Sequence, residues 1–141
     1  MILLDAYALV ALLRAERAGA DVRTLLRSGD CGMTASNLAE AADVLERVHG
    51  IGIGESRPRV EPLPLTVVDV DARLAWRAAE LRARHYRRRS SEVSMADCVL
   101  VAAARPGSDA VATADRAVAV MSRAEGVHVT ALPDRRGRRP A

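Results

Sequence analysis

Short apolar runs alternate with longer amphipathic stretches along most of this chain, and this alternation constrains the fold most strongly. The segment LTVVDVD (65–71) has the β-branched composition of a strand, and DARLAWRAAELRARHYR (71–87) carries its apolar residues at helical spacing. Strands separated by helices indicate βαβ units, and crossovers of this length give parallel strands. The chain is therefore predicted to be an α/β protein whose mainly parallel sheet is covered by helices on both faces.

The same reading predicts the order of the elements. Gly19 and Gly29 are expected to end the first two helices, and Asp69 or Asp71 to cap the helix that follows the third strand. The Gly- and Pro-rich segment 51–64 is expected to be a loop with at most one short turn of helix. Strands are expected at 1–5, 65–71, 109–115 and 127–132, and a brief extended piece is expected between 31 and the helix that begins near 36. Helices are expected at 6–18, 20–28, 36–49, 71–87, 94–105 and 116–126.

The length of 141 residues suits one domain with a single core. We assign residues 1–132 to this domain and 133–141 to a disordered basic tail. The N-terminal apolar run contains Asp5 and no basic segment precedes it, so neither a signal peptide nor a membrane span is predicted. A cytoplasmic location is the default expectation. Cys31 and Cys98 have apolar or small neighbours and imply no disulfide framework.

The net charge of +3 is unevenly distributed along the chain. LRARHYRRR (81–89) and DRRGRRPA (134–141) hold a large share of the arginines. This asymmetry suggests a polyanionic partner, although a solvated helix face and a frayed tail explain either cluster alone equally well. Because the chain has no Phe, one Trp and two Tyr, a groove of stacked aromatic side chains is not expected.

Acidic residues occupy the expected strand ends and helix starts. Asp5 and Asp115 end strands, whereas Glu40 and Asp97 fall in the first turns of helices. In an open parallel sheet these positions face one crevice, at the carboxyl ends of the strands. Taken singly, each acid is better explained as a helix cap, and Ser94 with Asp97 has nearly the form of a capping box.

The four acids considered as a set point instead to a metal. Carboxylates on one edge repel one another unless a cation lies between them. Asp5 and Asp97 also lie in apolar runs, where an unpaired charge is costly to bury. An all-oxygen ligand set favours Mg²⁺ or Mn²⁺ over zinc, and the three histidines follow no metal spacing. Such an ion activates water for attack on a phosphodiester.

The chain resembles PIN domains, and specifically the small VapC-type toxins of prokaryotic toxin–antitoxin pairs. LLDAYALVALL, SNLAEAADVL, SMADCVLVAAA and VATADRAV carry the resemblance, in the family's order and up to about Leu132. It implies a three-layer α/β/α sandwich and a Mg²⁺-dependent endoribonuclease, with Mn²⁺ as a substitute, that cuts structured RNA such as transfer or ribosomal RNA.

The resemblance also implies a role for each site residue. Asp5 and Asp97 would be the strongest metal ligands, Glu40 would bind the ion or position the attacking water, and Asp115 would complete the acidic cluster. Thr113 matches a position where the family often has a hydroxyl, which would hydrogen-bond a ligand carboxylate or the water. There are departures as well: Tyr7 stands where many relatives carry Ser or Thr, and the segment 51–64 is shorter and less helical than the usual antitoxin clamp.

Partners follow from the same resemblance. A cognate VapB-type antitoxin and a homodimer are expected, with Leu25 and Leu26 on a candidate dimer surface that the helices beginning at Ala6 and Asp21 supply. The arginines expected to contact the RNA backbone are Arg82, Arg84, Arg87, Arg88, Arg89 and Arg116. For Arg116, pairing with a neighbouring acid is an equally good explanation.

Two other functions stay open. One is a catalytically inactive interaction module that keeps the fold and binds an arginine-bearing partner peptide at the acidic crevice. The other is a 5′ nuclease that acts on DNA, which the short chain disfavours because it lacks room for the helices that thread a DNA flap.

Overall fold

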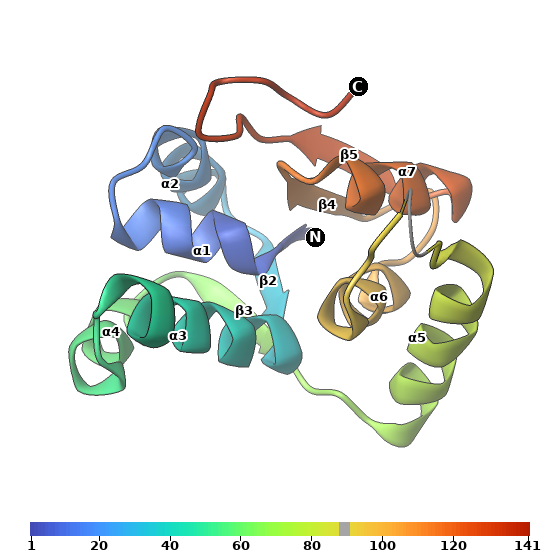
Figure 1. The fold of residues 1–141 in the computed structure, drawn as a ribbon, viewed down its shortest axis with the longest axis horizontal. Helices are drawn as coiled ribbons and strands as arrows, with labels where there is room; N and C mark the ends of the chain where they lie inside the picture. Colours follow the sequence, from blue (N-terminus) through green and yellow to red (C-terminus); the bar gives the residue numbers. More distant parts are fainter. Residues whose placement is uncertain (88–90) are drawn as a thin grey trace.

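A parallel sheet lies between two layers of helices in the computed structural model, which describes residues 1–87 and 91–141 (Figure 1). The strands are β1 (Ile2–Leu4), β2 (Cys31–Thr34), β3 (Leu65–Val68), β4 (Ala110–Thr113) and β5 (His128–Ala131). The helices are α1 (Ala6–Leu13), α2 (Gly19–Ser28), α3 (Ala35–His49), α4 (Ile53–Val60), α5 (Ala72–His85), α6 (Met95–Ala103) and α7 (Arg116–Ala124). The predicted three-layer α/β/α architecture is confirmed.

The order of the strands creates one distinctive position in the sheet. The order is β3-β2-β1-β4-β5, and neighbouring strands are parallel. The chain runs outward from β1 to β2 and β3 and then places β4 on the other side of β1. The carboxyl ends of β1 and β4 therefore flank a topological switch point, which is where open α/β sheets bind their ligands.

Apolar side chains fill both sides of the sheet. Leu3 packs into the core beneath α5, α6 and α7, which includes Leu81 and Leu100. Leu4 packs into the core beneath α1, α2 and α3, which includes Leu9 and Leu45. The division follows from the strand, because successive side chains point to opposite faces. Figure 1 shows α1 to α4 gathered on one side and α5 to α7 on the other. No helix in the described ranges is long and apolar enough to cross a membrane.

Gly19 begins a helix rather than ending one, so the prediction of a single helix over 6–18 is wrong. α1 ends at Leu13, and Ala15 adopts a left-handed conformation with φ of 54° in the turn that follows. A Cβ atom at Gly19 would lie 2.7 Å from the carbonyl oxygen of Ala11. The glycine therefore permits the close approach of α2 to α1.

The segment 51–64 contains a regular helix, α4, so the expectation of a loop is wrong. Arg57 pairs with Glu61 one turn later, with 2.6 Å between Nε and Oε1, and Val60 packs against the core formed with α3. These contacts outweigh the low helix propensity of Pro58. The region is therefore more helical than the comparison with the VapC-type clamp indicated.

The C-terminal tail follows a defined path beside the sheet, which differs from the expectation of disorder. The carboxylate of Asp134 accepts hydrogen bonds from the backbone N–H groups of Arg136 and Arg138, both at 2.8 Å, and Pro140 is buried. An aspartate whose side chain accepts from backbone N–H groups a few residues later stabilises a turn locally. Figure 1 shows the tail turning back from the end of β5 beside α2.

The candidate dimer surface on α2 is partly core. Leu26 is 5% exposed and belongs to the core beneath α1 and α3, whereas Leu25 is half-buried. A charge at Leu26 would therefore unfold the chain before it reported on an interface. Leu25 alone is suited to testing the expected dimer.

Candidate functional site

Asp5 lies at the carboxyl end of β1 and caps α1. Its side chain is 5% exposed, and its Oδ1 accepts a hydrogen bond from the backbone N–H of Ala8 at 2.8 Å. Burial raises the pKa of Asp5 to about 7, and the charges of Asp97 and Asp115 add to this shift, while the Thr113 side chain and the Ala8 N–H oppose it. The helix cap accounts for only part of this environment.

Asp97 forms the predicted capping box at the start of α6. Its Oδ2 accepts from the backbone N–H of Ser94 at 2.7 Å, and its own N–H donates to the Ser94 hydroxyl at 3.0 Å. Burial raises the pKa of Asp97, and the charge of Asp115 contributes in the same direction. Asp97 is therefore a cap that also belongs to a group of interacting acids.

Asp115 and Thr113 lie at the carboxyl end of β4. The Oδ1 atom of Asp115 accepts from the backbone N–H groups of Ala117 at 2.6 Å and Val118 at 3.3 Å, which caps α7. Its own N–H donates to the hydroxyl of Thr113 at 3.0 Å. Thr113 is fully buried, whereas Asp115 is exposed. Asp115 therefore stands at the mouth of the site and Thr113 in its floor.

Glu40 reaches the site from α3. It lies in the second turn rather than the first, because α3 begins at Ala35. Burial raises the pKa of Glu40, and the charge of Asp97 raises it further. The effects of these acids on one another's pKa values link Asp5, Glu40, Asp97 and Asp115, which come from four different elements. We call the region that these four acids border the acidic crevice.

The donor chemistry of the crevice fits a hard divalent cation. Oxygen ligands from several carboxylates are what Mg²⁺ and Mn²⁺ prefer. Burial is the main cause of the raised pKa values of Asp5, Glu40 and Asp97, and the charges of neighbouring acids raise these values further, although Arg82 acts in the opposite direction on Asp97. Over the described part of the chain, however, no three His, Cys, Asp or Glu side chains are grouped closely enough to hold a metal ion. The four acids therefore lie in the same region, but their side chains are not yet close enough together to coordinate one ion.

A polar group at the end of β2 was not predicted as part of the site. Asn37 is fully buried one helical turn before Glu40, and its Oδ1 accepts from the hydroxyl of Thr34 at 2.5 Å. Within the described residues its Nδ2 atom has no hydrogen-bond partner. In the sequence the Thr34 side chain looks only like a helix cap, which it also is. Its burial with Asn37 depends on the tertiary structure.

The predicted RNA-contacting arginines lie in several places. Arg82 donates to the carbonyl oxygen of Val93 and lies over the ring of Tyr86, 4.5 Å from its centroid. Arg84 pairs with Glu125 at 3.2 Å. The others are Arg87, which donates to a neighbouring carbonyl, Arg116, which is exposed at the start of α7, and Arg88 and Arg89, which lie outside the described residues. Arg82 and Arg84 thus have structural partners.

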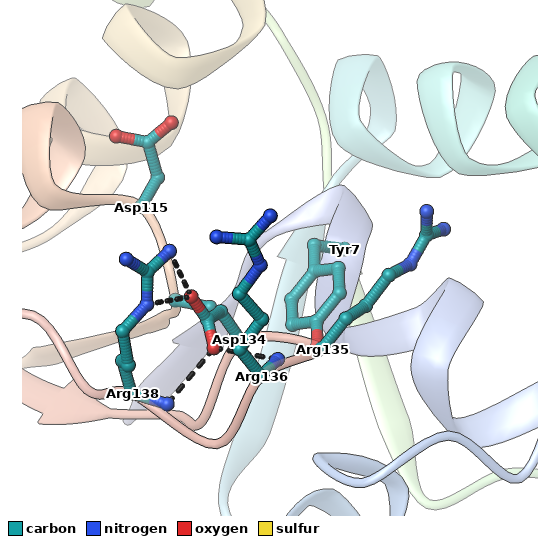
Figure 2. Close-up of a pocket in the computed structure, with 7 residues that line it drawn as sticks. Tyr7, Asp115, Asp134, Arg135, Arg136 and Arg138 are labelled. Carbon is teal, nitrogen blue, oxygen red and sulfur yellow. Dashed lines mark hydrogen bonds and ion pairs between the residues drawn. The ribbon is translucent and has the colours of Figure 1, made fainter.

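A pocket of about 390 Å³ opens beside Asp115, and the C-terminal tail forms one wall of it. Figure 2 shows Asp134 and Arg138 held together while Arg136 and Arg138 extend toward the side where Asp115 lies. Tyr7 lines the pocket and donates its hydroxyl to the carbonyl oxygen of Pro133 at 3.0 Å. The sequence signal for this wall was the basic tail, which a polyanionic partner and a frayed end explained equally well.

Comparison with models of sequence families identifies the PIN domain. A sequence model of the PIN domain matches residues 2–124, a range that contains all four acids. A search of curated proteins found no significantly similar sequence.

Several solved structures share the fold. A toxin–antitoxin complex from Klebsiella pneumoniae superposes with a TM-score of 0.60 at 16% identity, covering 84% of this chain and 90% of that one. FitAcB from Neisseria gonorrhoeae gives 0.56 at 24% identity, covering 92% and 96%. FitAB bound to an IR36 DNA fragment gives 0.55 at 23% identity, covering 92% and 94%. At these identities the likeness establishes the architecture.

Proposed function

The chain belongs to the PIN domain family, and from that premise we propose that it is a metal-dependent endoribonuclease toxin that hydrolyses phosphodiester bonds in structured RNA. The observation that carries the proposal is the burial of Asp5 within reach of the charges of Asp97 and Asp115, with a pKa raised to about 7. Such an arrangement weakens the folded state, because each acid makes ionisation of the next less favourable. Perturbed acids in a crevice are typical of functional sites.

Each acid has a distinct role in this proposal. Asp5 and Asp97 would hold Mg²⁺ or Mn²⁺, with Asp115 completing the set at the mouth. The bound ion would lower the pKa of a coordinated water and supply a nucleophile near neutral pH. Glu40 would accept a proton from the attacking water, since a carboxylate with a raised pKa is a better base near neutrality. The Thr113 hydroxyl would orient Asp5.

Partners form the second part of the proposal. Two of the similar structures are described as a toxin–antitoxin complex and as FitAB bound to DNA, and we infer that this chain too has an antitoxin, of the VapB type. An apolar groove between α3 and α4, lined by Leu38, Ile53 and Val60, is a suitable seat for it. A homodimer and a cytoplasmic location belong to the same proposal.

Cleavage of total RNA by the purified, antitoxin-free chain tests the proposal. The assay compares Mg²⁺, Mn²⁺ and chelator, and runs Asp97→Asn beside the unmodified chain. We expect metal-dependent cutting into discrete fragments and its loss in Asp97→Asn. Because the amide oxygen of asparagine can still accept the hydrogen bond from the backbone N–H of Ser94, the variant should stay folded, and its thermal melting curve checks this.

Asp71→Asn is the matched control. Asp71 caps α5 through a hydrogen bond from the backbone N–H of Leu74 at 2.7 Å, and it is exposed and takes no part in the acidic crevice. It makes the same chemical change at another helix start, so it should leave cleavage intact. Full activity in Asp97→Asn would refute the assignment.

A second candidate function is favoured by one observation, the absence of a finished metal-ligand set among the described side chains. A non-catalytic module would use the acidic crevice to bind an arginine-bearing peptide. Titration with Mn²⁺ separates the two: a folded chain that binds Mn²⁺ and leaves RNA intact would favour the interaction module.

A further inference from the structure

Arg136 differs from the other arginines of the tail. Arg135 pairs with Glu16 at 3.3 Å, and Arg138 pairs with Asp134 at 2.9 Å. Arg139 likewise pairs with Asp21 of α2, at 2.7 Å. Within the described residues the guanidinium of Arg136 makes no such bond, although its backbone N–H is held by Asp134. The tail thus fixes the backbone of Arg136 and leaves its charged end exposed.

The frame that holds Arg136 is connected to the acidic crevice. Tyr7, which fixes the tail through the carbonyl oxygen of Pro133, lies two residues after Asp5 on the first turn of α1. The pairs that Arg135 and Arg139 make attach the tail to the α1–α2 connection and to α2. Contacts of the tail residues before and after Arg136 therefore fix the position of Arg136 relative to the crevice.

Arg136 is the arginine of this pocket that is suited to bind an anion. Arg135, Arg136 and Arg138 contribute positive charge to the pocket, while Asp115 and Asp134 contribute negative charge. Arg138 and Asp134 compensate each other, and Arg135 is compensated by Glu16. In Figure 2 the guanidinium of Arg136 lies on the Asp115 side of the tail, so its positive charge lies in the same pocket as Asp115.

Resting on the proposed nuclease function, we propose that Arg136 binds a backbone phosphate of the RNA strand next to the bond that is cut. A polyanionic strand that approaches four carboxylates is repelled, and a guanidinium at the mouth offsets this repulsion. The planar guanidinium also suits the geometry of phosphate oxygens, which it binds with two parallel hydrogen bonds. Asp115 belongs both to the acidic group and to the lining of this pocket, so in this proposal a strand bound at the acids passes Asp115 to reach Arg136.

The test measures binding of a labelled, mixed-sequence RNA oligonucleotide at several NaCl concentrations, in the Asp97→Asn background so that the probe stays intact. Arg136→Gln should weaken binding about three- to tenfold and reduce the magnitude of the salt slope by about 0.7, the value for one lost phosphate contact on a single strand. Arg136→Lys should restore the slope more fully than the affinity, because lysine keeps the charge and loses the two-pronged geometry.

Arg73→Gln is the matched control, since Arg73 is an exposed arginine on α5, in the other helical layer. An equal effect from Arg73→Gln, or unchanged affinity and slope in Arg136→Gln, would overturn the inference. The inference would also be overturned if Arg136→Gln lost binding to a polyglutamate peptide but kept RNA binding, because the pocket would then serve an acidic protein segment. If the inference about Arg136 failed in one of these ways, metal-dependent cleavage by the unmodified chain would still support the nuclease proposal. If the chain with Asp97→Asn alone bound no RNA, both the nuclease proposal and the inference about Arg136 would be overturned.

Discussion

Asp5 and Asp109 are nearly equally buried, at 5% and 4% exposure, yet their surroundings are opposite. Asp109 lies just before β4, at the amino end of the sheet, where it accepts from the terminal amino group of Met1 at 3.0 Å and from Nε of Arg105 at 3.1 Å. The hydrogen bond from Arg105, more than any other cause, holds the pKa of Asp109 well below its usual value. At the carboxyl end, burial and neighbouring acids raise the pKa of Asp5 to about 7.

The difference separates a structural acid from a candidate functional one. At the amino end, every strong contact of the carboxylate is with a donor that favours its charged form, so Asp109 stabilises the fold. At the carboxyl end, the neighbouring acids carry charge of the same sign, so the charged form of Asp5 stabilises the fold less and is better suited to bind a cation. Residue type and exposed fraction are nearly the same in both cases, but burial is the main cause of the raised pKa at Asp5, whereas the hydrogen bond from Arg105 outweighs burial at Asp109. The exposed fraction alone therefore does not distinguish the two acids, and their surroundings do.

The largest expected effect is a loss of RNA cleavage on substitution of Asp5. Asp5→Asn keeps a side chain that caps α1 but removes the charge, so RNA cleavage should fall on the order of 100-fold or more while the fold persists. The measurement is the cleavage rate with saturating Mg²⁺, alongside a melting curve. Asp109→Asn, assayed at a temperature where it is folded, should retain cleavage. Equal losses in the two variants would show that the two ends of the sheet do not differ in function.

A smaller effect, on stability, is expected from substitution of Asp109 at the amino end of the sheet. Asp109→Asn replaces a carboxylate that accepts charged hydrogen bonds, and the free energy of unfolding should fall by about 2 kcal/mol, mostly through the hydrogen bonds because Arg105 itself is largely exposed and screened. Urea denaturation measures this change. Asp5→Asn should cost less than Asp109→Asn, or stabilise the chain; the reverse order would contradict the assignment of Asp109 as the structural acid.

The smallest effect is a dependence of stability on pH. Because the pKa of Asp5 is raised from 3.8 to about 7, the folded chain keeps a proton that the unfolded chain releases in this interval. The stabilising contribution of Asp5 is therefore complete below pH 3.8 and is lost as the pH rises through about 7. Relative to Asp5→Asn, the unmodified chain should lose at least about 1 kcal/mol over this range, as judged from urea denaturation.

Added Mg²⁺ sharpens that measurement. A cation bound to the ionised acids should reduce the loss near pH 7 in the unmodified chain and have little effect on Asp5→Asn. Asp109, whose pKa is lowered, should contribute its stability above pH 3.8 and lose it only as the pH falls below that value. Parallel pH profiles for the unmodified chain and Asp5→Asn would rule out the raised pKa of Asp5.

Much of the fold follows from local sequence. The β-branched run at 65–71 and the capping box of Ser94 and Asp97 depend on neighbours within a few residues, and both were predicted correctly in type. The helix α4 was missed because its formation depends on packing against α3, which the Gly- and Pro-containing segment does not reveal. The turn that makes Gly19 the start of α2 was missed for a similar reason.

For the site, the sequence by itself determined which acids stand at strand ends and helix starts, because those positions follow from the periodicity of each segment. Only the tertiary structure decided how the acids affect one another, since burial and the charges around a carboxylate come from elements distant in the chain. It also decided that Asp109 pairs with cations while other acids act on Asp5, and that the basic tail lies beside Asp115. Local spacing sets which residues are available; long-range packing sets their electrostatic environment and hence their chemistry.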